Sequence, residues 1–330
     1  MILPERIFQL TDDNYQDLCL EIFQFQARNC RLYSTFLDRL GVNPVKVKEV
    51  DSIPFLPIEF FKSHQIVSKQ GAPDIIFSSS GTTGTQQSQH FVMDLSLYES
   101  SFNKAFELFY GAPEEWVILA LLPSYQERDG SSLVYMVDHL IERSQNSESN
   151  SKSGYFLYDH DHLYQTLQHL KQRKQKTLLI GVTYALLDFT EKFSIREFPE
   201  LVVMETGGMK GRRKEMIREE VHKLLSAAFD LEKIHSEYGM TELLSQSYSG
   251  GDGLFSCPPW MKIKIRDTND PLTLIGQGKT GGINVIDLAN LYSCSFIATQ
   301  DLGRIHKTGQ FEVLGRFDHS DIRGCNLLVD

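Results

Sequence analysis

Apolar residues recur at three-, four- and seven-residue steps near the start of the chain, the spacing of a helix with one buried face. The residues concerned are Leu18, Ile22, Phe25, Leu32, Phe36 and Leu40. This pattern predicts one amphipathic helix or two over residues 14–40, ending at Gly41. The following segment 53–57 reads Ile-Pro-Phe-Leu-Pro, and its prolines exclude a helix and the interior of a sheet. We expect an ordered, apolar loop there.

From residue 75 onward, short apolar runs alternate with amphipathic segments. The apolar runs predict buried strands at 75–77, 116–122, 177–182 and 201–204. The amphipathic segments predict helices at 95–109, 131–141, 161–174 and 212–229. This alternation is typical of a layered α/β fold with parallel strands. After Tyr238 the pattern changes to glycines and short strands at 262–265, 282–286 and 295–298, which indicates a smaller β-rich subdomain.

Composition and charge narrow the class of protein. The 330 residues are 41% hydrophobic and 23% charged, as in ordinary soluble proteins, and suffice for one large domain or two lobes. The formal net charge of -10 argues against binding to a nucleic-acid duplex, which needs a basic face. It does not exclude an anionic ligand, because backbone N–H groups can bind phosphate.

The chain shows neither an export signal nor a membrane span. No apolar run approaches the roughly 18 residues that a spanning helix needs. The N-terminus lacks the basic start and apolar core of a signal peptide. The five cysteines are odd in number and lack the spacing of metal ligands, so reduced thiols in a cytoplasmic protein are expected.

A loop of hydroxyl residues and glycines, Ser78-Ser79-Ser80-Gly81-Thr82-Thr83-Gly84, follows the strand that ends at Phe77. The two glycines allow the backbone to curl its N–H groups around phosphate oxygens. No lysine follows the second glycine, so the loop is not a Walker A motif. Taken alone, the segment fits a polar surface turn equally well.

Further motifs could complete a nucleotide site, although each taken alone could be an ordinary turn. In Tyr238-Gly239-Met240-Thr241-Glu242, the ring can stack on a base, and the hydroxyl and carboxylate can meet a phosphate and its Mg²⁺. Gly207-Gly208 follows the strand 201–204, where ligands gather in α/β sheets. Asp301 can accept ribose hydroxyls, and Arg316 can donate to ribose or phosphate.

The order and spacing of these motifs resemble the adenylate-forming superfamily of acyl-CoA synthetases, luciferase-like enzymes and peptide-synthetase adenylation domains. That superfamily has an S/T-G-T-T-G loop, a Gly-Gly turn, a Y-G-x-T-E motif, a ribose-binding Asp and a G-R-x-D hinge. The counterparts here extend over residues 77–324. The resemblance implies a ligase that uses ATP and Mg²⁺ to activate a carboxylic acid as an acyl-adenylate.

The resemblance also implies roles for individual residues. The phosphate loop would contact the β- and γ-phosphates, the Gly-Gly turn and the tyrosine would hold adenine, and the Asp and Arg would hold ribose. The implied ATP-binding residues are Ser80, Gly81, Thr82, Thr83, Gly84, Gly207, Gly208, Tyr238, Gly239, Asp301 and Arg316. Thr241 would bind the α-phosphate, and Glu242 would bind Mg²⁺.

The sequence departs from the large families after the hinge. There the hinge is followed by a mobile C-terminal domain with a catalytic lysine, whereas here a few residues follow Asp318. We expect the large N-terminal lobe of the adenylate-forming fold at 1–315, a hinge and short tail at 316–330, and no C-terminal catalytic lobe. Either another cation then stabilises the α-phosphoryl transition state or the step is slow, and Lys210, Arg212 and Arg213 are candidate cations by position.

A short chain of this kind is most similar to the LuxE-type acyl-protein synthetases, which activate fatty acids for bacterial fatty-acid reductases. The Phe61-Lys62 pair and the segments 53–57, 122–132 and 321–325 also fit that family. Its members pass the acyl group to a cysteine near their C-terminus, and Cys325 is the counterpart here. The resemblance thus implies a fatty-acid substrate and an acyl reductase or another acceptor protein as partner. Arg323 and His319 would favour the thiolate of Cys325 if they lie close to it, whereas an inert buried thiol is the alternative.

Two other functions remain open at the level of sequence. One is an acyl- or aryl-CoA ligase, in which CoA accepts the acyl group. The other is a non-catalytic protein that binds nucleotide on a degenerate adenylation fold. The segment Asp159-His160-Asp161-His162 contains metal-binding residue types, but neighbours at a helix start point in different directions, so we expect a helix cap. His90 could reach a phosphate or face solvent.

Overall fold

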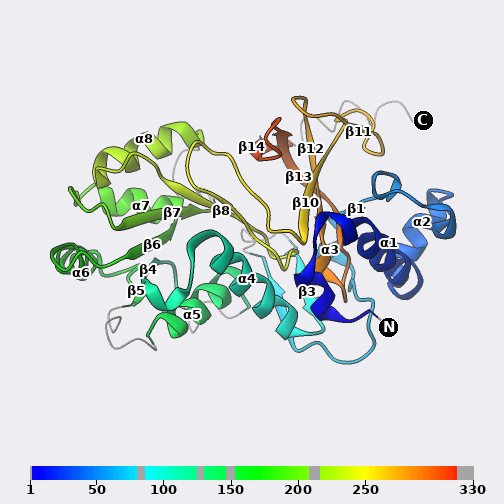
Figure 1. The fold of residues 1–330 in the computed structure, drawn as a ribbon, viewed down its shortest axis with the longest axis horizontal. Helices are drawn as coiled ribbons and strands as arrows, with labels where there is room; N and C mark the ends of the chain where they lie inside the picture. The colour runs from blue at the N-terminus through cyan, green and yellow to red at the C-terminus, as the bar shows by residue number, and fades with distance from the viewer. Residues whose placement is uncertain (1, 80–85, 125–129, 146–152, 208–215, 318–330) are drawn as a thin grey trace.

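A computed structural model describes residues 2–79, 86–124, 130–145, 153–207 and 216–317 (Figure 1). Within these ranges the chain forms two six-stranded sheets and one two-stranded hairpin. The first sheet comes from the middle of the chain, and the second sheet combines an N-terminal strand with the strands after residue 260. None of the described helices has the length and apolar character that crossing a bilayer requires.

The first sheet has the order β5-β4-β6-β7-β8-β9, and only its last pair of strands is antiparallel. Side chains of β4 and β6 are buried along their whole length, as expected for parallel strands covered on both faces. The predicted parallel α/β body is therefore confirmed. The strands are β4 (Val117–Leu121), β5 (Gly154–Tyr155), β6 (Thr177–Val182), β7 (Leu201–Thr206), β8 (His235–Tyr238) and β9 (Ser247–Ser249).

Helices cover both faces of this sheet. Figure 1 shows α4 and α5 on one side and α7 and α8 on the other. Ring contacts hold each pair together, Phe102 with Tyr135 between α4 and α5, and Phe189 with Phe229 between α7 and α8. The helices are α4 (Leu95–Tyr110), α5 (Ser132–Gln145), α6 (His160–Gln172), α7 (Thr183–Thr190) and α8 (Arg218–Phe229).

The second sheet has the order β1-β13-β12-β10-β11, with β14 also paired to β13. It confirms the predicted β-rich part of the chain after Tyr238. The loop expected at 53–57 is corrected in part, because Leu56–Pro57 forms β1 at the edge of the sheet, where proline is tolerated. The other strands are β10 (Met261–Arg266), β11 (Leu274–Ile275), β12 (Thr280–Asp287), β13 (Phe296–Ile305) and β14 (Phe311–Arg316).

The amphipathic N-terminal segment forms two helices that pack on the second sheet. α1 (Asp12–Asn29) and α2 (Arg31–Arg39) are separated at Cys30, whose backbone is extended. Phe23 and Tyr33 contact the ring of Phe296 on β13, and their centroids lie 5.9 and 6.3 Å from it. Shorter helical turns complete the described chain, namely η1 (Pro4–Gln9), η2 (Pro44–Lys46), η3 (Val50–Ser52), α3 (Phe60–Ser63), η4 (Pro113–Glu115) and η5 (Leu288–Asn290).

The hairpin of β2 (Ile75–Ser78) and β3 (Gln89–Val92) frames the predicted phosphate loop. Its open end is closed by two hydrogen bonds, from the Ser79 amide to the Ser88 carbonyl at 3.0 Å and from the Ser88 amide to the Ser79 hydroxyl at 3.0 Å. Loop residues 80–85 lie outside the described residues, so the structure defines the base of the loop.

Candidate nucleotide and acyl-activation site

Tyr238, Asp301 and Arg316 meet where the first sheet adjoins the second. The Tyr238 hydroxyl at the end of β8 donates to Asp301 Oδ2 at 2.8 Å. Arg316 Nε donates to Asp301 Oδ1 at 3.0 Å, and the two residues face each other across β13 and β14. The structure therefore brings together three residues that the sequence predicted for adenine and ribose.

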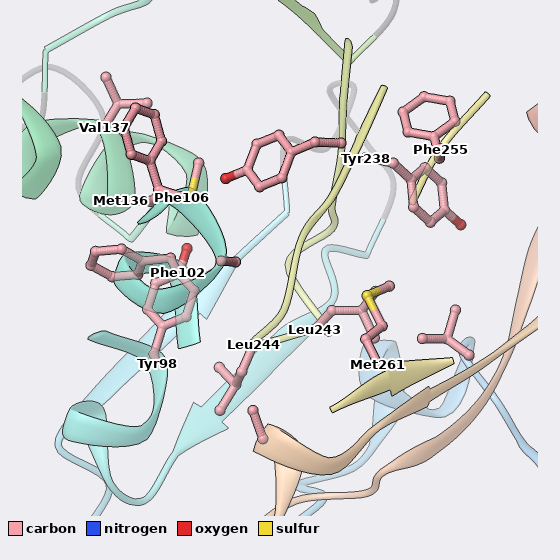
Figure 2. Close-up of a cluster of buried hydrophobic side chains, with 14 of the residues drawn as sticks. Tyr98, Phe102, Phe106, Met136, Val137, Tyr238, Leu243, Leu244, Phe255 and Met261 are labelled. Carbon is pink, nitrogen blue, oxygen red and sulfur yellow. The ribbon is translucent and has the colours of Figure 1, made fainter. Parts of the chain in front are cut away.

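This cluster leaves Asp301 able to bind more donors. A carboxylate has about four lone-pair positions, and Tyr238 and Arg316 use one on each oxygen. The Tyr238 ring is held edge-on by Phe255 and Phe311, whose centroids lie 5.9 and 5.5 Å away. Figure 2 shows Phe255 beside Tyr238. Burial, reinforced by Asp301, raises the pKa of Tyr238, so its hydroxyl stays protonated and acts as a fixed donor.

His90 joins the phosphate-loop hairpin to the Thr-Glu motif. Its Nδ1 lies 2.9 Å from the Thr241 carbonyl, which can only accept, so Nδ1 bears the proton. The side chain is 1% exposed, and its Nε2 has no hydrogen-bond partner among the described residues. Burial lowers the pKa of His90 to about 4. The solvent-facing alternative is therefore wrong, and His90 is a neutral link between two predicted ATP-binding segments.

Glu242 is buried beside the base of the phosphate loop. Burial raises the pKa of its carboxyl, against the opposing effects of Ser88 in the hairpin, Arg316 and Lys62 on α3. The described residues contain no group of three His, Cys, Asp or Glu side chains that could hold a metal. Mg²⁺ commonly binds through one or two carboxylates with substrate phosphates, so the single carboxylate of Glu242 fits such a site.

A buried acid that the sequence did not predict orients the segment after Glu242. Asp287 Oδ2 accepts from the Leu244 and Ser245 amides at 2.8 and 3.0 Å, and its Oδ1 accepts from the Ser245 hydroxyl. Asn290 Nδ2 donates to the Glu242 carbonyl at 2.8 Å. Asp287 and Asn290 thus attach the Thr-Glu motif to the second sheet.

The turn after β7 also lies in a polar environment. Gly207 has a φ of +72°, and its carbonyl accepts from the Thr183 hydroxyl at 3.1 Å. Glu205 lies 3.4 Å from Arg218 Nε and 3.6 Å from His222 Nε2. Burial raises the pKa of Glu205, but His222, Arg218 and the Ser236 hydroxyl lower it overall, so the carboxylate is charged.

Several predicted site residues lie outside the described residues. They are Ser80, Gly81, Thr82, Thr83, Gly84, Gly208 and Cys325, together with the hinge residue Asp318 and the cations Lys210, Arg212 and Arg213. Elsewhere, Asp159 Oδ1 accepts from the His162 amide at 3.0 Å at the start of α6, which confirms the predicted helix cap.

A family model for LuxE acyl-protein synthetases matches residues 146–330, which is more than half of the chain. The chain belongs to the LuxE family. This match includes Tyr238, Glu242, Asp301 and Arg316. A comparison with curated proteins finds no match.

Solved structures show that this LuxE-family chain has the adenylate-forming fold. It is similar to 2-hydroxyisobutyryl-CoA ligase in complex with 2-HIB-AMP and CoA, with a TM-score of 0.68 and 12% identity over 93% of this chain and 70% of that one. ATP-bound MatB from Rhodopseudomonas palustris gives a TM-score of 0.56 and 18% identity over 75% of this chain and 49% of MatB. The luciferase-like enzyme of the nonluminescent mealworm Zophobas morio gives 0.52 and 16%, over 76% and 60%.

The chain thus spans about half the length of MatB. The likeness supports the fold expected from the sequence, a layered α/β lobe with an adjoining β-rich part.

Proposed function

We propose that this LuxE-family chain activates a carboxylic acid with ATP, giving an acyl-adenylate and pyrophosphate. The observation that supports this most strongly is the hydrogen-bonded cluster of Tyr238, Asp301 and Arg316 at the junction of the two sheets. It offers a ring, a carboxylate with free lone pairs and a guanidinium within one contact network, which suits a nucleoside monophosphate.

In the first step, a carboxylate oxygen of the acid attacks the α-phosphorus of ATP. The bond from the α-phosphorus to the bridging oxygen breaks, and pyrophosphate leaves. The loop residues Ser80, Thr82 and Thr83 would hold the departing phosphates, and Thr241 would hold the α-phosphate. His90 supports this arrangement because it ties the loop hairpin to the Thr241 carbonyl. The contribution of these residues is positioning and charge stabilisation.

Glu242 would hold Mg²⁺ together with phosphate oxygens. When bound, the ion supplies positive charge to the oxygens that become negative as pyrophosphate departs. Lys62 and Arg316 act on the same carboxyl electrostatically. Both could add positive charge near the phosphates.

In the second step, a thiolate attacks the acyl carbon, the bond to the phosphate oxygen breaks, and AMP leaves. The thiol proton passes to solvent or to a nearby base beforehand. The four described cysteines suit this role poorly, because burial raises the pKa of each, to about 12 for Cys19 and Cys257. Cys325 is therefore the proposed acceptor within the chain, and a thiol on a partner protein is the alternative. A fatty acid is the substrate that the family suggests.

Carboxylate-dependent exchange of labelled pyrophosphate into ATP tests the first step. The assay should use a panel of carboxylic acids with Mg²⁺. Exchange with at least one acid supports the proposal. ATP binding without exchange for any acid would instead favour a nucleotide-binding protein without turnover.

Intact-mass measurement after incubation with ATP and an exchange-active acid tests the second step. An acyl adduct that hydroxylamine removes and that Cys325→Ala lacks supports Cys325. An adduct that persists in Cys325→Ala contradicts it. Release of acyl-CoA on addition of CoA would identify a CoA ligase.

A further inference from the structure

Three buried polar side chains form a row across the first sheet. Thr206 on β7 is in register with Glu237 on β8, and Glu237 is in register with Tyr248 on β9. Residues directly opposite in neighbouring strands point to the same face of a sheet. The three side chains are buried, with Glu237 7% exposed and Tyr248 3% exposed.

Glu237 is the ionisable residue at the centre of this row. Its Oε2 accepts from the Thr206 hydroxyl at 2.5 Å. Its Oε1 lies 2.4 Å from the position that a Cβ on Gly239 would take, so glycine at 239 makes room for this carboxyl. Within the described part of the chain, no lysine, arginine or histidine forms a salt bridge with Glu237. Burial, together with the negative charge of Glu205, raises the pKa of Glu237 to about 7 against the opposing effect of the Thr206 bond.

Two more acceptors beside Glu237 lack partners. Gln246 Oε1 and the Tyr248 hydroxyl are buried and have no hydrogen-bond partner among the described residues. Gln246 Cγ lies 3.3 Å from the position of a Cβ on Gly239, on the same side as Glu237 Oε1. A buried polar group without a partner is costly and rare in native proteins. Two buried oxygens without a partner among the described residues therefore lie beside a carboxylate that has one donor, the Thr206 hydroxyl.

The row adjoins the proposed ATP site. Thr206 immediately precedes Gly207, and Glu237 immediately precedes Tyr238. Alternation along the strands places the row on the face opposite to Tyr238. On the row's side, Tyr98, Phe102 and Phe106 of α4 and Met136 of α5 form a cluster of aromatic and apolar side chains (Figure 2). Glu237 acts electrostatically on Tyr98, so the row lies beside this cluster, and an acyl group that extends from the nucleotide toward the cluster would meet the row.

We propose that Glu237, Gln246 and Tyr248 recognise a hydrogen-bond donor on the acid, so that the activated acid carries an amino or hydroxyl group. This inference rests on the proposed acyl-adenylate function and narrows its substrate. An ammonium group would supply both the missing positive charge and the donors. An unsubstituted alkyl chain would leave the Gln246 and Tyr248 oxygens unpaired and add no donor to Glu237, and sites of that kind reject such analogues strongly.

Exchange kinetics with matched acids test the inference. Acids of equal chain length should be compared in sets of three, unsubstituted, hydroxyl-bearing and amino-bearing, with the substituent moved along the chain. We expect at least one amino- or hydroxy-acid to exceed its unsubstituted match in kcat/KM by about tenfold or more. Exchange that favours the unsubstituted acid in every set overturns the inference and leaves the proposed function intact. Exchange with no acid overturns the proposed function itself.

Substitutions in the row test which residues set the preference between substituted and unsubstituted acids. Tyr248→Phe removes a hydroxyl for which the described residues offer no hydrogen-bond partner, so the unfolding temperature should hold while the preference for the substituted acid falls severalfold. Glu237→Leu should shift the preference toward the unsubstituted acid. Glu237→Gln should retain exchange with a hydroxy-acid and lose exchange with an amino-acid. This variant therefore shows which of the two donors the site binds. An unchanged preference in both Tyr248→Phe and Glu237→Leu overturns the assignment.

Tyr33→Phe is a matched control. The Tyr33 hydroxyl is also buried but donates to the Pro54 carbonyl at 2.6 Å, far from the row. This variant should lower the unfolding temperature and leave the preference among acids unchanged. A change in preference as large as that of Tyr248→Phe would attribute the effect to general destabilisation and overturn the assignment.

Discussion

The Tyr238 hydroxyl donates to Asp301 Oδ2 at 2.8 Å and thereby joins the last parallel strand of the first sheet to β13 of the second. The bond fixes the orientation of the Asp301 carboxylate, and ribose binding would depend on that orientation. It also spans 63 positions of sequence, so the two halves of the site exist only in the folded chain.

Tyr238→Phe should weaken ATP binding and leave adenine stacking possible. The substitution keeps the ring in contact with Phe255 and Phe311 and removes the donor to Asp301. We expect the KM for ATP in the exchange assay to rise about tenfold, because hydrogen bonds to charged groups contribute about 1.5–3 kcal/mol. A KM equal to that of the wild type would show that the bond does not orient Asp301.

His90→Leu should lower the exchange rate at saturating ATP, because it frees the phosphate-loop hairpin from Thr241. His90→Asn is the matched variant, since its side-chain N–H can donate from near the position of Nδ1 and should restore part of the rate. Pyrophosphate exchange for both variants is the measurement. Equal losses in the two variants would assign His90 a packing role only.

The same histidine should affect stability in acid. Burial lowers the pKa of His90 to about 4, below its ordinary value of 6.5. Between these values the unfolded chain binds a proton and the folded chain does not, so stability falls as the pH drops from about 6.5 to 4. Urea unfolding of His90→Asn across that range should show a shallower decline than the wild type. Parallel curves would contradict a buried neutral imidazole.

Most regular elements follow from the hydrophobic pattern, and the exceptions have physical reasons. α7 was not predicted because six of its eight residues are buried, which leaves no polar face for periodicity to reveal. The hydrophobic pattern does not predict β8, because its residues are His, Ser, Glu and Tyr. Three of these four side chains are buried, and Tyr238 belongs to the candidate site, where sequence rules are expected to fail.

The candidate site was predictable where a motif is continuous in sequence. Tyr238, Asp301 and Arg316 form the expected cluster, but their mutual hydrogen bonds depend on the pairing of two sheets. His90 and Asp287 act through contacts with residues 151 and 42 positions away. A single sequence contains no local signal for such contacts.

Glu242→Ala should impair Mg²⁺-dependent exchange far more than folding. Glu242 forms its backbone contact through the carbonyl to Asn290, which alanine retains. The variant loses a buried carboxyl whose pKa burial has raised, so the cost to folding should be small. Titration of exchange against Mg²⁺ should show a higher requirement for the ion, and thermal unfolding provides the control. An unchanged Mg²⁺ titration would refute the metal role.

Lys62→Ala should slow acyl-adenylate formation, because Lys62 is a described cation that acts on the Glu242 carboxyl from α3. Positive charge near the transferring phosphoryl group stabilises its transition state, and loss of one such group costs about tenfold or more in rate. Exchange at saturating ATP and acid measures this effect. Lys62→Arg should retain part of the rate, since it preserves the charge. Lys46→Ala, at the end of η2, is the control for loss of a surface charge and should behave as the wild type. If Lys62→Ala also behaves as the wild type, the stabilising cation must come from elsewhere, and Arg316 becomes the next residue to test.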